Sequence, residues 1–437
     1  MLLNKIRKLS FNLIDLLSGG NISKHYKDIK KILDEHNLQR LKFGSEKKLN
    51  ELLTHAVNST EFYFTHKNFK NINDFPVIKK SIVQKNFENL RSKEYLNKKY
   101  HKVSTSGSTG VPFFIYQDMN KRKRNIADVI YYFNKVGYEI GNRLYEFEVW
   151  RSHNKKSKIK SLIQNVHQFD VSKLTNDKIL QLVNLLKKDK KPKAFLGFAS
   201  AYESICQFFE NNKENVEFNF NVKTIVANSE YLNDYTRVNM SKIFNAPIYS
   251  RYSSEEIGII AQQIEGSAEE FVINWASYYI ELLDFNSDLP AENGKLGRIV
   301  VTDLYNYCMP LIRFDTGDIG VFSNVKKGQL PNFKKVEGRK MDIIYDTTGN
   351  VVSSFVVYTK FYNYYKFLKQ YQFIQINQKE YLIKLNLIHD SFEYEEDLIS
   401  AVKSDFGDDA IVKIEYVNEI PVLASGKRKK VLSFYNK

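Results

Sequence analysis

The chain has 437 residues and a formal net charge of +15, and 43% of its residues are hydrophobic. Its 28 Tyr and 31 Phe provide enough apolar surface for a sizeable core, which excludes a disordered chain, and its two cysteines, Cys206 and Cys308, exclude a disulfide framework or a Cys-rich zinc site. The positive charge favours anionic partners, namely nucleotides, acidic saccharides, membrane surfaces or nucleic acid.

Residues 1–17 combine Leu, Ile and Phe with Lys5, Arg7 and Lys8 at helical spacing. No apolar run in the sequence reaches the ~20 residues that a membrane-spanning helix needs, and residues 1–17 lack the continuous apolar segment of a signal peptide. Such a segment is either an amphipathic helix that lies on a membrane surface or the first helix of a globular domain. We therefore predict a cytoplasmic protein. If residues 1–17 form a membrane-surface helix, we also expect peripheral association with the inner face of the membrane.

Residues 1–95 are predicted to be mainly helical, because apolar residues recur at three- and four-residue spacing over 24–36, 46–58 and 78–90. Strands are predicted at 100–103 and 113–117. Strands that alternate with helices from about 170 to 260 favour a parallel sheet covered on both faces, so the predicted fold class is α/β (α+β with mixed sheets). The predicted helices after residue 120 are 125–136, 173–188, 201–211 and 234–244, and the predicted strands are 144–150, 194–197, 222–227, 247–249, 270–275, 278–285, 297–303 and 318–322.

The last part of the chain is predicted to be a separate small α+β unit, with a boundary near Gly338. The two predicted domains are thus 1–337 and 338–437. Within the second, the predicted strands are 343–346, 351–358, 371–377, 381–387 and 411–416, with a hairpin turn at 378–380 and a helix at 393–404.

Residues 104–110 are seven consecutive Ser, Thr and Gly residues in a chain with only 19 glycines. Small residues allow a tight turn whose backbone N–H groups, together with the hydroxyls, form a concave anion site. The Lys of the G-x-x-x-x-G-K-[ST] phosphate loop is absent, so that family is excluded. Two interpretations stay open on the loop alone, a phosphate cradle and a flexible turn between two strands.

Further segments follow this loop in a fixed order. They read Tyr-Ser-Ser-Glu-Glu-Ile-Gly at 252–258, Pro-Leu-Ile-Arg-Phe-Asp-Thr-Gly-Asp at 310–318, Gly-Arg at 338–339 and Ser-Gly-Lys at 425–427. Together they resemble the adenylate-forming ligase superfamily. The similarity is closer to its phenylacetate–CoA ligase-like branch, which includes CapK-like proteins of capsular polysaccharide biosynthesis. Residues 76–80 (Pro-Val-Ile-Lys-Lys) are also similar to that branch.

The resemblance implies a role for each segment. The loop would cradle the β- and γ-phosphates of ATP, Glu256 would hold Mg²⁺, and Asp318 would accept hydrogen bonds from the ribose hydroxyls. Tyr252, with Ser229 and Glu230, would contact the adenine, and Lys427, on a mobile C-terminal lid, would offset charge during adenylation. The implied ATP-binding residues are Thr105, Ser106, Gly107, Ser108, Thr109, Gly110, Ser229, Glu230, Tyr252, Asp318 and Arg339, and the implied catalytic residues are Glu256 and Lys427.

The residue types alone leave structural alternatives open for the acidic positions and the terminal lysine. Glu255 and Glu256 could form a solvated acidic turn, and Asp318 could belong to an ordinary Gly-Asp turn that opens a strand. Lys427 could be part of a solvated basic tail, because Arg428, Lys429 and Lys430 follow it.

Alternatives also stay open for three residues elsewhere. Ser229 or Asn233 could be the N-cap of the helix that follows the predicted strand at 222–227. Arg313 could contact a carboxylate or phosphate of a ligand, or it could form a structural salt bridge.

The resemblance implies an ATP- and Mg²⁺-dependent ligase. It would form an acyl-adenylate and transfer the acyl group to CoA, an amine or a sugar hydroxyl, in surface or capsular polysaccharide biosynthesis. Glu255 and Met341 depart from the family pattern, and these departures favour the alternative of a non-catalytic nucleotide-binding or assembly protein of such a pathway. No basic helix or aromatic RNA-binding signature is present, so no specific nucleic-acid partner is expected.

Overall fold

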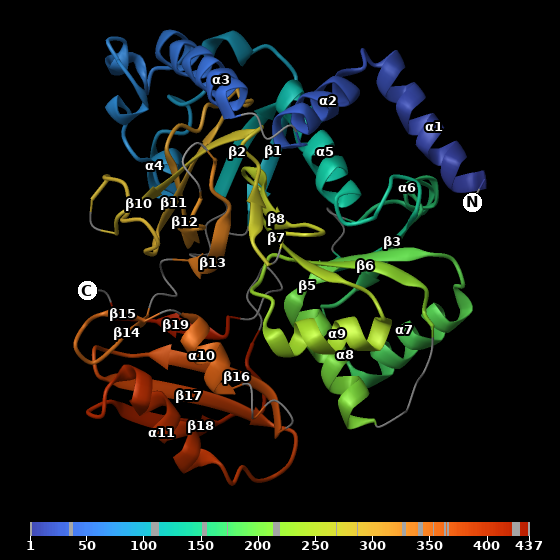
Figure 1. Ribbon diagram of the computed structural model, residues 1–437, viewed down its shortest axis with the longest axis vertical. Helices are drawn as coiled ribbons and strands as arrows, with labels where there is room; N and C mark the ends of the chain where they lie inside the picture. The colour runs from blue at the N-terminus through green and yellow to red at the C-terminus, as the bar shows by residue number, and fades with distance from the viewer. Residues whose placement is uncertain are drawn as a thin grey trace. The chain divides into compact units, whose positions relative to one another are not determined.

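The computed structural model describes residues 2–34, 38–105, 113–150, 155–172, 174–212, 219–267, 269–285, 287–325, 329–339, 344–352, 354–361, 364, 367–421 and 429–435 (Figure 1). The chain forms two compact units. Unit 1 comprises Met1–Arg143, Lys158–Asn165 and Tyr249–Val336, and unit 2 comprises Leu144–Ser157, Val166–Ile248 and Glu337–Lys437. The division into domains 1–337 and 338–437 stays a prediction.

Unit 1 combines helices with an antiparallel part of the large sheet. Strands β10-β11-β12-β13-β9-β8-β7 are neighbours in that order, and β1 pairs separately with β2 as an antiparallel hairpin. The helices are α1 (Leu2–Leu17), α2 (Asn21–Asp34), α3 (Leu38–Ser59), α4 (Lys80–Lys85), α5 (Met119–Asn134) and α6 (Lys158–Gln164), with short 3-10 turns at Phe64–His66, Ile72–Asp74 and Lys93–Tyr95. The strands are β1 (Tyr100–Thr105), β2 (Phe113–Asp118), β7 (Ile248–Ser254), β8 (Gly258–Gln263), β9 (Phe271–Ile273), β10 (Tyr278–Leu283), β11 (Gly297–Asp303), β12 (Phe314–Phe322) and β13 (Phe333–Arg339).

The core of unit 1 forms because α3 and the central strands bury apolar faces. In α3 the buried apolar residues recur at the spacing of one helix face. These residues are Leu49, Leu52, Leu53, Ala56 and Val57. Every residue of β11 is buried, as expected for a strand covered on both faces.

Unit 2 contains the parallel part of the sheet, with strand order β6-β5-β3-β4. Its C-terminal stretch forms a two-stranded sheet, β14-β15, and a four-stranded sheet of order β18-β17-β16-β19. The helices are α7 (Asn176–Lys188), α8 (Ala199–Asn211), α9 (Asp234–Phe244), α10 (Ser354–Phe361) and α11 (Glu395–Phe406). The strands are β3 (Arg143–Glu148), β4 (Val166–Asp170), β5 (Lys193–Phe198), β6 (Val222–Asn228), β14 (Ile344–Tyr345), β15 (Val351–Val352), β16 (Leu368–Gln375), β17 (Glu380–Leu387), β18 (Ile411–Tyr416) and β19 (Val431–Ser433).

Two predicted elements differ from the structure in that more than half of their predicted length does not form the predicted type of element. The helix predicted over 78–90 is limited to α4, and the strand predicted over 351–358 ends at Val352, after which α10 begins. The apolar run in α10 suggested a strand by propensity. Val357 and Phe361, one helical turn apart, are both fully buried, so packing of one helix face overrides that propensity. The predicted α/β class with mixed sheets is confirmed.

Candidate functional site

Tyr252 and Asp318 meet in unit 1, where they are carried by β7 and β12. The Tyr252 hydroxyl donates to Asp318 Oδ2 at 2.8 Å and lies 3.3 Å from Thr316 Oγ1. Gly317, with φ of +80°, bends β12 immediately before Asp318, and the Asp318 N–H donates to Thr316 Oγ1 at 3.1 Å. Asp318 therefore lies within a strand that begins at Phe314 rather than opening one.

Burial raises the pKa of Tyr252 well above its ordinary value, and the neighbouring Asp318 carboxylate raises it further. The negative charge of Glu256 adds to the same upward shift. Tyr252 is therefore a neutral hydrogen-bond donor throughout the ordinary pH range. Its ring is edge-on to Phe333, with ring centroids 6.3 Å apart.

Glu256 is a buried carboxylate in the turn between β7 and β8. Its side chain is 5% exposed, and its Oε1 lies 2.5 Å from Lys80 Nζ. Gln117 Nε2 donates to the Glu256 backbone oxygen at 3.1 Å and holds the turn against β2. Glu255 is exposed, so only the first of the two acids fits the alternative of a solvated turn.

Lys80 is the member of this site that sequence reasoning missed. It begins α4, and its ammonium group lies 5.1 Å from the centre of the Phe113 ring. Phe113 is the residue at which β2 begins, three residues after the end of the Ser/Thr/Gly segment at Gly110. The only signal for Lys80 in the sequence was its place in the segment 76–80, which had no assigned role.

The segment before Lys80 is fixed to β12 by backbone hydrogen bonds. The Ile78 N–H donates to the Arg313 carbonyl at 3.0 Å, and the Asp315 N–H donates to the Ile78 carbonyl at 2.9 Å. Arg313 itself is buried and pairs with Glu281 at 3.0 Å. Its guanidinium also donates to the Phe75 carbonyl at 3.1 Å, so the structural salt bridge is the confirmed alternative for Arg313.

The residues around Glu256 fit a magnesium ion that arrives with a nucleotide. Mg²⁺ in nucleotide sites is held by one or two carboxylates and by phosphate oxygens. Within the described ranges, no group of three or more His, Cys, Asp and Glu side chains could hold a metal ion. A magnesium ion at Glu256 would thus complete its shell with phosphate oxygens and water, and it would compete with Lys80 for the carboxylate.

Ser229 and Glu230 lie in unit 2, in the loop between β6 and α9. Ser229 adopts a left-handed backbone conformation with φ of 66°. Glu230 Oε2 accepts from the Ser200 N–H at 2.8 Å, in the first turn of α8, where the helix dipole favours a negative charge. Asn233 is the N-cap of α9, because its side chain accepts from the Thr236 N–H at 2.7 Å.

Two buried acceptors, one at the end of β6 and one in the loop that follows it, have no hydrogen-bond partner among the described residues. They are Glu230 Oε1 and Asn228 Oδ1. A buried polar atom without a partner costs free energy, and such groups are rare in folded proteins. These residues therefore offer two acceptors to a donor that the chain itself does not provide within the described ranges.

Comparisons with known proteins agree with this architecture. Residues 344–433 match the CapK C-terminal domain family. The chain is 24% identical to Protein CapK of Staphylococcus aureus over 432 residues, which cover 93% of this chain and 91% of that protein. The structure of 2-hydroxyisobutyryl-CoA ligase in the postadenylation state, in complex with R3-HIB-AMP, matches with a TM-score of 0.70 at 16% identity, over 89% of this chain and 88% of that one. The chain has the fold of the adenylate-forming ligases.

A further adenylate-forming ligase supports the same conclusion. ATP-bound MatB from Rhodopseudomonas palustris matches with a TM-score of 0.54 at 13% identity, over 75% of this chain and 66% of that one. The predicted resemblance to the CapK-like branch of the superfamily is confirmed. No helix in the described part of the chain is long and apolar enough to cross a membrane.

Several of the residues expected from the adenylate-forming resemblance cannot be placed. Residues 106–112, which include Ser106 to Gly110, lie outside the described residues, and so do Met341 and Lys427. Thr105 and Arg339 are described as the last residues of β1 and β13. Cys206 and Cys308 are buried, free thiols.

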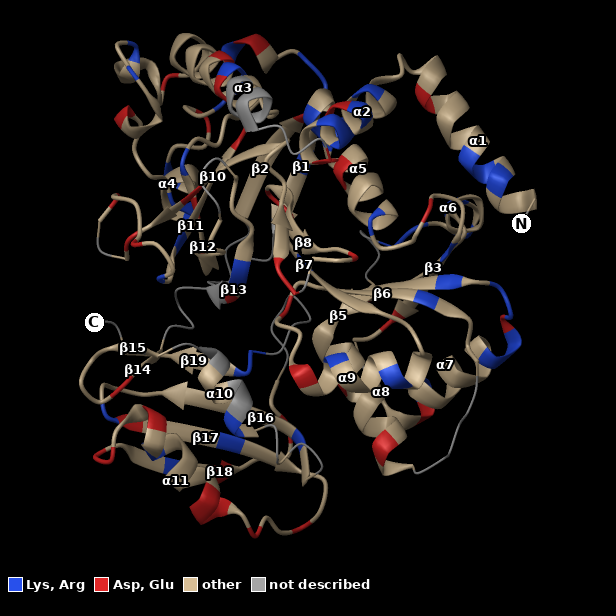
Figure 2. Cartoon of the chain, viewed as in Figure 1, with Lys and Arg blue, Asp and Glu red and all other residues tan. Residues whose placement is uncertain are grey.

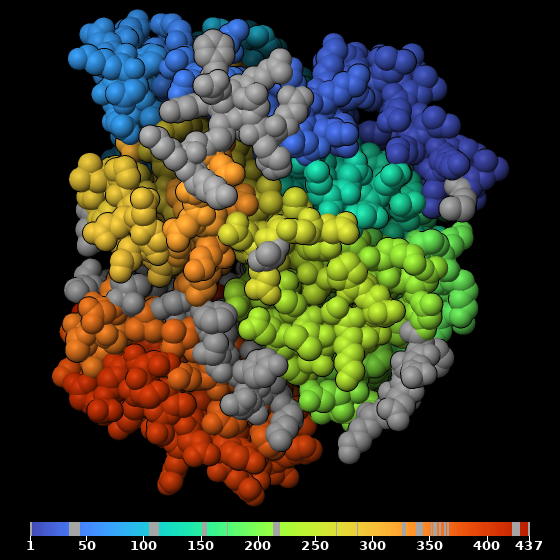
Figure 3. Space-filling model, viewed as in Figure 1, coloured from blue at the N-terminus to red at the C-terminus, as the bar shows by residue number. Residues whose placement is uncertain are grey.

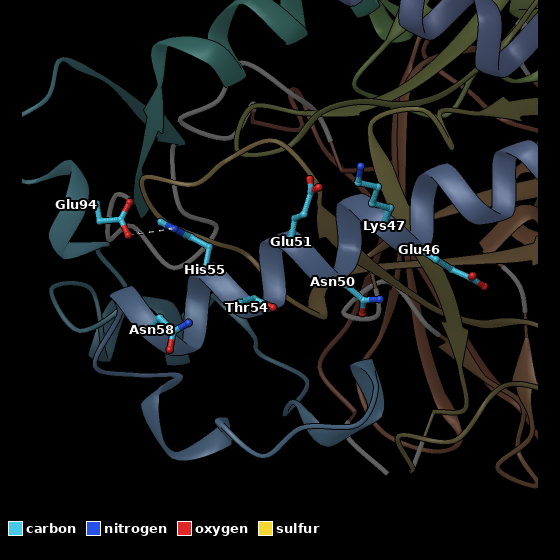
Figure 4. A pocket seen from close by; sticks show the side chains of 8 residues that line it. All are labelled: Glu46, Lys47, Asn50, Glu51, Thr54, His55, Asn58 and Glu94. Carbon is cyan, nitrogen blue, oxygen red and sulfur yellow. Dashed lines mark ion pairs between the residues drawn. The ribbon is translucent and has the colours of Figure 1, made fainter.

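A separate hollow of about 730 Å³ lies along α3 in unit 1 (Figure 4). Three glutamates and one lysine line it, a charge balance that disfavours a polyphosphate. His55 is held there by Glu94, 3.8 Å from its Nδ1, and by the Tyr307 carbonyl, 3.0 Å from its Nε2. The lining residues are Glu46, Lys47, Asn50, Glu51, Thr54, His55, Asn58 and Glu94, none of which belongs to the predicted ATP site.

Proposed function

We propose that the protein activates a carboxylic acid as an acyl-adenylate with Mg-ATP and transfers the acyl group to CoA or another acceptor, in surface or capsular polysaccharide biosynthesis. The observation that carries the proposal is the environment of Glu256. It is a buried carboxylate paired with Lys80, in the turn that directly follows β7, the strand that carries Tyr252, and it lies in the fold of the adenylate-forming ligases. The capsule role rests on the likeness to Protein CapK.

The reaction has two steps in this proposal. A carboxylate oxygen of the acid attacks the α-phosphorus of ATP, and the bond to the bridging oxygen breaks as pyrophosphate leaves with the electron pair. The thiol of CoA, an amine or a hydroxyl then attacks the acyl carbon, loses its proton and expels AMP. Because the first step concentrates charge on the leaving pyrophosphate, positioning and charge neutralisation provide most of the catalysis.

The described side chains have distinct roles in this scheme. Asp318, oriented by Tyr252, accepts from the ribose hydroxyls, and Glu256 supplies an oxygen ligand to magnesium, which would neutralise the phosphates. Lys80 holds the Glu256 carboxylate in place before the nucleotide binds. Glu230 Oε1 and Asn228 Oδ1 are acceptors suited to the adenine amino group.

The decisive experiment is the exchange of radiolabelled pyrophosphate into ATP across a panel of carboxylic acids. We expect exchange with at least one acid and none without acid. Lys427→Ala should abolish exchange while nucleotide binding persists, and Lys413→Ala, an exposed lysine elsewhere in unit 2, should leave it unchanged. Absence of exchange across a wide panel of acids, in protein that binds ATP, would reject the proposal.

A second function is favoured by two observations. The Lys80 ammonium is paired with the Glu256 carboxylate, and Glu255 adds a charge that the family pattern lacks. A non-catalytic nucleotide-binding or assembly protein would keep this pair intact. In that case the Lys427→Ala variant would still restore the capsule pathway in a complementation experiment. If the protein is a ligase, the Lys427→Ala variant would not restore it.

A further inference from the structure

Helix α1 packs against unit 1 with the wrong face for an ordinary surface helix. Amphipathic helices normally bury their apolar face in the core and expose the polar one. In α1 the buried residue is Asp15, which caps the start of α2 by accepting from the Ile22 and Ser23 N–H groups at 3.0 and 2.9 Å. Asn4 donates to Asn142 at 3.1 Å, so the polar face of α1 contacts the protein.

The opposite face of α1 carries large apolar side chains that are 47% to 79% exposed. Eight residues of one helix share this exposure, which exceeds the scattered apolar residues of an ordinary surface. Figure 3 shows α1, in dark blue, on the surface of unit 1. The residues are Leu2, Leu3, Ile6, Leu9, Leu13, Ile14, Leu16 and Leu17.

Helix α6 extends the exposed apolar surface. It lies beside α1, because Arg7 Nη2 donates to the Leu162 carbonyl at 3.2 Å. Ile159, Leu162 and Ile163 are 62% to 72% exposed on this short helix. We call the eight residues of α1 and these three residues of α6 the apolar patch.

Exposed lysines lie on the two helices of the apolar patch and on α2, the helix that follows α1. Lys5 is exposed on α1, Lys158 and Lys160 are exposed on α6, and α2 exposes a row of lysines (Figure 2). The two aspartates of α2 are engaged in ion pairs, Asp28 with Arg124 and Lys48, and Asp34 with Lys135. The exposed lysines of α2 are Lys24, Lys27, Lys30 and Lys31.

We propose that the apolar patch docks this protein onto the surface of a membrane that contains anionic phospholipids. A helix with leucines on one face and lysines beside it lies in the interface, with its apolar side chains among the acyl chains and its cations at the headgroups. The lysines argue against a second copy of the chain as the occupant, because two such surfaces would bring like charges together. The proposal is independent of the ligase activity.

The test is co-sedimentation of the full chain with vesicles, without ATP or acid. We expect binding to vesicles of phosphatidylcholine mixed with phosphatidylglycerol, weaker binding at high salt, and little binding to phosphatidylcholine alone. The triple variant Leu9→Gln, Leu13→Gln and Leu16→Gln should lose about tenfold or more in partition coefficient. The matched control is the triple variant Leu96→Gln, Leu180→Gln and Leu289→Gln, three exposed leucines elsewhere, which should bind as the unmodified protein does.

A second measurement guards against a variant that fails to fold. Leu13→Trp should shift its fluorescence to shorter wavelength when the anionic vesicles are added, and Leu289→Trp should not. Protein that stays in the supernatant with anionic vesicles would overturn the proposal, as would equal losses in the two triple variants. If the unmodified protein is a dimer that does not bind vesicles, and the α1 triple variant is a monomer, the apolar patch is instead the contact surface for a second copy.

Discussion

Glu256 and Glu230 are two buried or half-buried carboxylates that the same resemblance assigned to the ATP site, and the structure holds them in different ways. Glu256, in unit 1, is neutralised by the ammonium group of Lys80 at 2.5 Å. Glu230, in unit 2, accepts from a backbone N–H at the start of α8 at 2.8 Å. The Lys80 side chain is flexible and 33% exposed, so it can move away from Glu256. The N–H group that Glu230 accepts from belongs to the backbone of a helix and cannot move away.

This difference separates a carboxylate that can change partners from one that cannot. When a dication arrives at Glu256, Lys80 can swing into solvent at small cost, because an exposed ammonium is well hydrated. Glu230 keeps its helix contact and has only Oε1 left to offer. We therefore expect substitutions at Glu256 to affect the reaction, and substitutions at Glu230 to affect both stability and nucleotide choice.

Glu256→Gln should give the largest effect. The amide keeps the shape of the side chain but cannot supply a charged oxygen ligand, so we expect pyrophosphate exchange to fall about 10²–10³-fold, similar to the loss of a charge-stabilising group in other active sites. Thermal unfolding should change little, because Lys80 is partly exposed and stays hydrated. The measurement is exchange at saturating ATP and magnesium.

Glu255→Gln is the matched control for that substitution, because it makes the same chemical change at the adjacent, exposed residue. It should leave exchange within about twofold, as surface substitutions usually do. Equal losses in the two variants would show that general charge near the turn matters and that Glu256 has no special role.

Asp318→Asn should have the next largest effect. The amide still accepts from Tyr252, but it binds the ribose hydroxyls without a negative charge, and charge-assisted hydrogen bonds are roughly twice as strong as neutral ones. We expect the KM for ATP to rise about tenfold while kcat changes less, together with a smaller preference for ATP over 2′,3′-dideoxy-ATP. Asp390→Asn, an exposed aspartate in unit 2, should leave both quantities unchanged. An unchanged preference in Asp318→Asn would place the ribose elsewhere.

A comparison of the predicted elements with the surroundings of Glu256 shows where prediction from the sequence succeeds and where it stops. The helix at 234–244 and the strands at 297–303 and 411–416 were predicted with the bounds that α9, β11 and β18 have, because local periodicity decides them. The burial of Glu256 was not predictable in the same way. It depends on Lys80 and Gln117, which come from distant parts of the chain and reach Glu256 only through tertiary packing.

Local sequence also left the role of each residue in the β6–α9 loop undecided. Either Ser229 or Asn233 could have been the helix N-cap, and the structure assigns the cap to Asn233. The left-handed conformation of Ser229 had no sequence signal, because neither glycine nor asparagine occupies that position. The apolar face of α1 shows the same limit, since periodicity predicts the helix but not which of its faces the protein covers.

Glu230→Ala should combine a loss of stability with a loss of nucleotide selectivity. Removal of the acceptor at the start of α8 should cost about 1–2 kcal/mol of unfolding free energy. If Oε1 accepts from the adenine amino group, the preference for ATP over inosine triphosphate should fall about tenfold. Glu396→Gln, an exposed acid in the first turn of α11, should lose less stability and keep the selectivity. Loss of stability alone would restrict Glu230 to a capping role.

Ser229→Gly should give the smallest effect on stability and the clearest separation of the two interpretations of this loop. A serine with φ of 66° is strained by about 1 kcal/mol relative to glycine, so the substitution relieves that strain in the folded protein. Glycine has greater conformational freedom in the unfolded chain, which destabilises the folded state by about 0.5–1 kcal/mol and offsets most of the relief. The unfolding free energy should therefore change by less than about 0.5 kcal/mol. Asn245→Gly, at the left-handed C-cap of α9, is the matched control, with φ of 46° and no assigned contact to nucleotide. If the KM for ATP rises in Ser229→Gly and not in Asn245→Gly, the hydroxyl contacts the nucleotide; if both variants behave alike, Ser229 only turns the chain between β6 and α9.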